Sequence, residues 1–267
     1  MFWLYGDALP AGVGGERWCA AHLTYLAAFL TLSVCWAFLY GHLDGERRKT
    51  ADRVLGSLVF FFGLCHYGML ALTGHFGLYT LPLHLCSLMF LAAPLHAWTG
   101  AARPGSFAAG LCGFLGAILF FPGIPGTWAA LLFPDWLDYP FRNALSISCF
   151  LSHGLLAVYG ASILVRQAEA PDPVGLFWRD LKYSALFLGV GGALMYVFDR
   201  AAGVNYWFLL APSVDSPFEG VWRRGGRGGY LSALLLTAAA VTALWYGLRY
   251  LLFVRGRDGR SERFASK

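Results

Sequence analysis

Charged residues are scarce in this sequence. Only 13% of its 267 residues are charged, whereas 58% are hydrophobic. An ordinary soluble domain is about a quarter charged, and one soluble core could not bury so much apolar surface. The composition therefore excludes a typical soluble domain and predicts an all-α, polytopic bundle of transmembrane helices. We expect residues 1–267 to form one domain, because helices of about 20 residues and short loops use up the chain.

Several familiar motifs are absent. The six cysteines form no C-x-x-C pair, and there is no H-x-x-x-H, H-E-x-x-H or phosphate-binding loop. A secreted disulfide framework would not lie within hydrocarbon. We therefore expect no nucleotide site and no cofactor. The cysteines are Cys19, Cys35, Cys65, Cys86, Cys112 and Cys149.

Apolar runs without interior charge predict about seven spans. Their expected boundaries are 18–41, 54–74, 81–99, 106–124, 143–165, 180–200 and 230–253.

Lys and Arg are distributed unequally between the two sides of such a bundle. One side carries six of the twenty, and the other carries the remaining fourteen. Because cytoplasmic loops are enriched in Lys and Arg, we expect the N-terminus outside and the C-terminus in the cytoplasm. The net charge of +5 then needs no nucleic-acid partner. The short loops and the lack of an organelle address favour a bacterial inner membrane.

Four residues stand out as candidates for chemistry, because polar and ionisable groups at membrane depth are costly. They are His66, His84, Cys86 and His153. Cys86 lies roughly 7–8 Å into its span at 1.5 Å per residue, and the two histidines of other spans fall in the same outer half. The outer connection 201–229, which contains Asn205 and Tyr206, lies over that half.

The segment LPLHLCSL, residues 81–88, begins the third span. Pro82 suits the first turn of a helix, and a helix N-terminus near Cys86 favours a thiolate. His84 and Cys86 are two residues apart and face different ways. The base for Cys86 should therefore come from another helix, with His153 as the first choice and His66 as the second.

Two chemistries fit these residues. A Cys/His dyad near the outer leaflet suits acyl transfer through a thioester, with Cys149 as a competing thiol. His84, His66, Asn205 or Tyr206 would orient the dyad or stabilise the oxyanion. Arg142 could hold a phosphate, although an interfacial, snorkelling arginine is the explanation that we favour. The other chemistry is a Zn site, which the residue types allow but the spacing does not support.

The LPLHLC motif, the histidine of span five and the later GVNYWFL resemble the YwaF-type integral membrane family. That family is related to vertebrate transmembrane protein 164, an acyltransferase acting on ether phospholipids. The resemblance implies a bundle of six or seven helices, with Cys86 as the nucleophile and His153 as the base. It implies a membrane lipid, such as a (lyso)phospholipid, as the substrate of a transferase or hydrolase.

The alternative is a non-enzymatic transporter or lipid-binding protein with a polar, His-lined cavity. The halves show no convincing internal repeat, and the sequence suggests no intramembrane Asp or Glu for ion coupling. Both features disfavour transport. The sequence leaves the oligomeric state open.

Overall fold

A computed structural model describes residues 2–4, 8–213 and 216–251 of the chain. The described residues form helices and loops and contain no strand. Six helical segments are long and apolar enough to cross a membrane, and a shorter apolar helix accompanies them. The expected all-α, polytopic bundle is therefore confirmed, and the orientation in the membrane stays a prediction.

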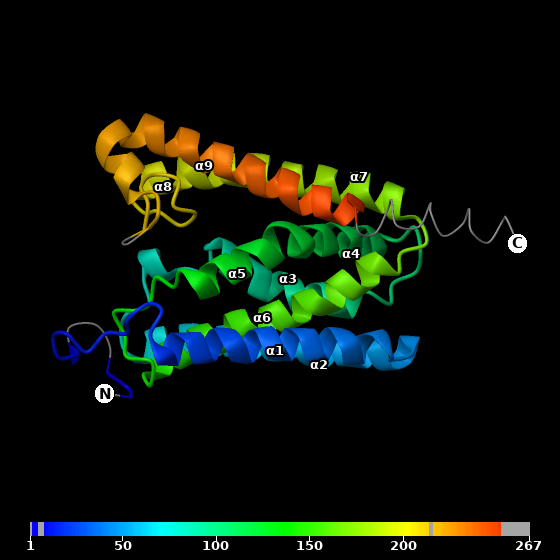
Figure 1. The fold of residues 1–267 in the computed structure, drawn as a ribbon, viewed down its shortest axis with the longest axis horizontal. Coiled ribbons are helices and arrows are strands. Elements are labelled where there is room, and N and C mark those ends of the chain that lie inside the picture. The colour runs from blue at the N-terminus through cyan, green and yellow to red at the C-terminus, as the bar shows by residue number, and fades with distance from the viewer. Residues whose placement is uncertain (1, 5–7, 214–215, 252–267) are drawn as a thin grey trace, which may run out of the picture.

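The helices form three adjoining groups (Figure 1). The first comprises α1 (Ala20–Gly41), α2 (Gly45–Leu72) and α6 (Ala144–Ala168). The middle group comprises α3 (Leu85–Thr99), α4 (Phe107–Ile118) and α5 (Ile124–Leu132). The third comprises α7 (Pro173–Leu186), α8 (Gly192–Ala202) and α9 (Glu219–Arg249). Helices α2 and α6 pack against α3, and α4 packs against α7.

Helix α6 lies at the centre of the bundle, with 78% of its most apolar window buried. Small residues make this possible, because they let neighbouring backbones approach closely in a lipid-embedded bundle. At Gly154 an added Cβ would overlap the ring of Phe29 from α1. The small glycine, alanine and serine side chains of α6 therefore let the surrounding helices pack closely against it.

Two predicted spans are broken helices. A π-helical segment, Leu119–Gly123, joins α4 to α5, and Phe121 within it has non-helical φ and ψ values. Pro122 follows, and proline cannot supply the N–H that a regular helix needs there. The apolar segment therefore continues to Leu132 rather than ending near residue 124. A second π-helical segment, Phe187–Gly191, joins α7 to α8.

Three helices begin earlier than hydropathy indicates, because charged residues lie in their N-terminal parts. Asp44 caps α2 by accepting a hydrogen bond from the Arg47 amide at 2.9 Å. Helix α7 begins at Pro173, and α9 begins at Glu219 with a sharp break at Gly226, where φ is +57°. Residues 252–253 of the last predicted span lie outside the described residues.

Candidate functional site

The LPLHLC segment forms a turn followed by the start of α3. His84 is the N-cap residue, and Cys86 lies in the first turn of the helix. The helix begins at Leu85, so Pro82 precedes it rather than lying in its first turn as expected. The Trp207 indole N–H donates to the Leu83 carbonyl at 2.9 Å, which holds this stretch outside the helix.

His153 is buried in α6 and is held from three sides. Its Nδ1 lies 2.8 Å from the Cys149 carbonyl oxygen. Because a carbonyl can only accept, Nδ1 carries the proton, and Nε2 of the neutral ring carries the lone pair. Trp136 stacks on the ring at 5.0 Å, and Phe90 meets it edge-on at 5.2 Å.

The Nε2 atom of His153 is buried and has no hydrogen-bond partner. No other histidine of the described residues has a buried ring nitrogen in this condition. His22, by contrast, uses both nitrogens, one on the Trp18 amide and one on the Leu131 carbonyl. An unpartnered buried polar atom needs an explanation, and a proton-accepting role at His153 is one.

The structure shows a thiol–imidazole contact between the competing thiol, Cys149, and the second candidate for the base, His66. Cys149 Sγ lies 3.5 Å from His66 Nδ1. Among the hydrogen bonds of the described residues, none joins Cys86 to His153. The Cys86–His153 dyad therefore stays a prediction, and Cys149–His66 is the pair already in contact.

Further polar groups surround Cys86. The Tyr67 hydroxyl of α2 forms a hydrogen bond with the Ser87 hydroxyl, next to Cys86 in the chain. Asp135, in the loop between α5 and α6, is close enough to act electrostatically on His84, Cys86 and Cys149. Its side chain keeps an exposed edge, yet the surrounding protein raises the pKa of this carboxyl, and the neighbouring His84 opposes that shift.

The outer connection does cover the start of α3. The Tyr206 hydroxyl donates to the Leu78 carbonyl, and its ring meets His84 edge-on at 5.0 Å. Asn205, however, holds its own loop together: its amide donates to the Ala211 carbonyl at 2.8 Å and accepts from the Leu210 amide at 3.0 Å. We refer to residues 203–213 as the cover loop.

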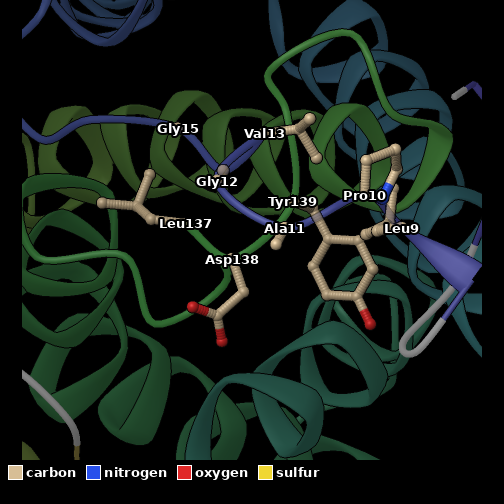
Figure 2. A pocket seen from close by; sticks show the side chains of 10 residues that line it. Leu9, Pro10, Ala11, Gly12, Val13, Gly15, Leu137, Asp138 and Tyr139 are labelled. Atoms are coloured by element: carbon tan, nitrogen blue, oxygen red, sulfur yellow. The ribbon is translucent and has the colours of Figure 1, made fainter.

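Arg142 is exposed in the loop before α6. In the same region, the N-terminal segment lies against the α5–α6 loop and leaves an open cavity of about 620 Å³ (Figure 2). The Gly15 amide donates to the Leu137 carbonyl at 2.6 Å. A Cβ on Gly14 would approach this carbonyl oxygen to 2.7 Å, so the contact requires glycine. None of the predicted site residues lines this cavity.

Zinc finds no support in this geometry. Within the part of the chain that the structure describes, no three His, Cys, Asp or Glu residues are arranged to hold a metal ion.

Two buried acidic residues were missed from the sequence, of which Asp199 lies near the site and Asp180 lies at the other end of the bundle. Asp199, in α8, is completely buried, and so is Asp180 in α7. The expectation of no intramembrane acid is therefore wrong for these helices. Asp135 also escaped notice, because loop carboxylates are usually solvated and only the fold brings this one near His84. The sequence does carry a signal for Asp199, since it falls inside the predicted span 180–200.

These features define a polytopic helical membrane protein in which buried and half-buried cysteine and histidine side chains gather near a cover loop. The sequence model of the TMEM164 family matches residues 18–249. The chain therefore belongs to the TMEM164 family, which confirms the resemblance seen in its motifs. No curated protein and no solved structure shows significant similarity to it.

Proposed function

We propose that this protein transfers acyl groups of membrane lipids, as a transferase or hydrolase, through a thioester on Cys86 with His153 as the base. The observation that carries the proposal is the buried, unpartnered Nε2 of His153, whose tautomer is set by the Cys149 carbonyl. The position of Cys86 in the first turn of α3 supports it, because N–H groups at a helix N-terminus stabilise negative charge.

The reaction follows from these groups. His153 Nε2 takes the thiol proton as Cys86 sulfur attacks the ester carbonyl. The unpaired N–H groups of the first turn of α3 face the developing oxyanion. The lysolipid oxygen leaves with the proton from His153, and a hydroxyl of a second lipid or of water then attacks the thioester. Cys86 recovers its proton through the same histidine.

Asn205 contributes indirectly in this scheme. Its amide group is engaged within the cover loop, so it shapes the loop rather than donating to the oxyanion. The hydroxyl of Tyr206 is likewise engaged, on Leu78. Arg142 would meet a lipid phosphate only at the exposed edge of the site.

The test uses purified protein in mixed micelles with a phospholipid labelled in its acyl chain and a lysolipid acceptor. Intact-protein mass spectrometry at short times should detect an acyl adduct that hydroxylamine removes, and peptide mapping should place it on Cys86. Cys86→Ala should abolish the adduct, whereas the matched variant Cys149→Ala should retain it. His153→Gln should slow its formation far more than His66→Gln does.

A second assignment of the nucleophile is favoured by the 3.5 Å contact between Cys149 and His66. In that case the pattern reverses: Cys149→Ala and His66→Gln remove the adduct, and Cys86→Ala keeps it. If lipid binds and no variant alters its covalent state, the protein is instead a lipid-binding or transport protein, and the catalytic proposal is wrong.

A further inference from the structure

Two stacked rings at the base of the proposed dyad carry complementary polar groups. Trp136, in the loop between α5 and α6, stacks on His153 with ring centres 5.0 Å apart and planes inclined by 28°. Its indole nitrogen is buried and has no hydrogen-bond partner among the described residues, and the same holds for Nε2 of His153. The indole N–H can only donate, whereas Nε2 can only accept because Nδ1 carries the proton. The pair therefore presents one donor and one acceptor that the fold leaves unused.

The two groups cannot satisfy each other. A hydrogen bond requires the N–H to point at the acceptor, and the indole N–H and the imidazole lone pair each lie in the plane of their own ring. In rings that stack at 28°, each group therefore points past the other ring. Both side chains are at most 8% exposed, and an unsatisfied buried polar group costs on the order of 1–3 kcal/mol. A ligand that supplies both partners would explain why this cost is tolerated.

A hydroxyl group supplies both partners from one oxygen atom, because it accepts one hydrogen bond and donates another. With hydrogen bonds of about 2.9 Å, one oxygen bridges two nitrogens up to about 5.8 Å apart, which is comparable to the separation of 5.0 Å between the ring centres. An ionised phosphate or carboxylate offers His153 no proton. The rings of Phe90 and Phe150, which meet His153 and Trp136 edge-on, also make a charged group costly here. The chemistry of the pair therefore favours an uncharged hydroxyl.

We propose that Trp136 and His153 together bind the hydroxyl group that attacks the thioester, so that Trp136 is a further substrate-binding residue. The indole N–H holds the hydroxyl oxygen, and His153 Nε2 takes its proton as the oxygen bonds to the acyl carbon. The carbon–sulfur bond then breaks, and the thiolate of Cys86 receives the proton from His153. This step rests on the proposed function, whereas binding of the hydroxyl needs no catalysis. The hydroxyl belongs either to a lipid alcohol or to water, which the experiments distinguish.

The binding experiment uses the double variant Cys86→Ala/Cys149→Ala, in which neither candidate thiol can react. Native mass spectrometry from detergent compares a lysophospholipid that carries a free hydroxyl with the same lipid in which hydrogen replaces that hydroxyl. The hydroxyl lipid should bind about tenfold more tightly, because the deoxy lipid leaves a buried donor and acceptor unpaired. Trp136→Phe keeps an aromatic ring on His153 and removes the donor, so it should reduce this preference to less than about threefold.

Trp245→Phe is the matched control. Trp245, in α9, is the other described tryptophan with a buried indole nitrogen that has no partner, and its ring lies 5.6 Å from that of Phe120. This variant should keep the parental preference. If Trp136→Phe does not fold, benzothienylalanine is placed at position 136 instead, because this isostere of tryptophan has sulfur in place of the N–H.

A kinetic measurement identifies the source of the hydroxyl. The acyl-enzyme of the parent protein is formed first, and its decay is followed with and without the hydroxyl lipid. A lipid alcohol yields acylated lipid and water yields free fatty acid, and Trp136→Phe should slow the step that operates by about tenfold or more. Parental behaviour of Trp136→Phe in both experiments overturns the proposal. If the hydroxyl preference depends on Trp136 and no acyl-enzyme forms, acyl transfer is wrong and the hydroxyl site stands.

Discussion

The ion pair between Asp180 of α7 and Arg249 of α9 gives the sharpest test of the packing. Both side chains are almost completely buried, and Arg249 NH1 lies 3.2 Å from an Asp180 carboxylate oxygen. The same carboxylate accepts from Gln167 at 2.8 Å and from Arg179 at 2.9 Å. Among the residues that the structure describes, Arg249 has no other carboxylate within salt-bridge distance, and its guanidinium rests on aromatic rings, with Phe120 at 4.8 Å.

This arrangement makes the two partners unequal. Asp180→Asn leaves the Arg249 guanidinium buried without a counter-ion, and breaking a buried pair in this way costs about 3–5 kcal/mol. Arg249→Met leaves Asp180 with Arg179 and Gln167 and fills much of the same apolar space. We expect that variant to lose about 1.5–3 kcal/mol, the value of one charged hydrogen bond.

The assay is the free energy of unfolding from SDS titration in mixed micelles, followed by helical circular dichroism. Asp180→Asn should be the more destabilised single variant, and adding Arg249→Met to it should restore stability, because the uncompensated charge is then gone. The reasoning fails if Arg249→Met costs as much as Asp180→Asn, or if the double variant is less stable than Asp180→Asn alone.

Three further predictions concern packing, the cover loop and orientation. Gly154→Ala should lower the unfolding free energy by about 1–3 kcal/mol, because its Cβ overlaps Phe29 and the core is already filled; an unchanged SDS midpoint would contradict this. Trp207→Phe keeps the aromatic packing and loses the indole hydrogen bond, so a loss of about 0.5–1.5 kcal/mol is expected in the same titration. If the N-terminus lies outside, a cysteine-free protein carrying Arg142→Cys should react with an impermeant maleimide in intact cells. A cysteine-free protein carrying Arg47→Cys should react only after lysis. The reverse pattern would show that the predicted orientation is wrong.

The spans were predictable because a bilayer requires long apolar segments whose backbone hydrogen bonds are satisfied within the helix. Hydropathy detects those segments and little beyond them. It therefore missed the N-terminal parts of α2, α7 and α9, which contain charged residues. The caps that Asp44 gives α2 and Asp172 gives α7 become evident only in the folded structure. It also ended the fourth span at residue 124, just after Pro122, because a break within a helix and the end of a helix look alike in a sequence.

The sequence predicted which cysteines and histidines lie in this region better than it predicted which thiol contacts which imidazole. A thiol and an imidazole on different helices meet only if depth and rotation both agree, and sequence gives depth to within a few residues. That error spans a full turn of α6, which is the spacing between Cys149 and His153. The sequence therefore ranked His153 over His66 without a physical means of deciding, whereas the structure places His66 on Cys149 at 3.5 Å.

For the acidic residues, the environment of the side chain in the fold is more informative about a role than the residue type is. From the sequence, Asp199 is one acid near the end of a predicted span, and this position alone does not show whether its side chain is buried or solvated. In the fold it is completely buried, bound by one backbone amide and otherwise unpaired. Such a group persists only where something offsets its cost, and the Tyr206 amide is the donor that binds it in the described part of the chain. Because the ring of Tyr206 also meets the ring of His84, the N-cap residue of α3, the bond to Asp199 helps to hold the cover loop over the start of that helix.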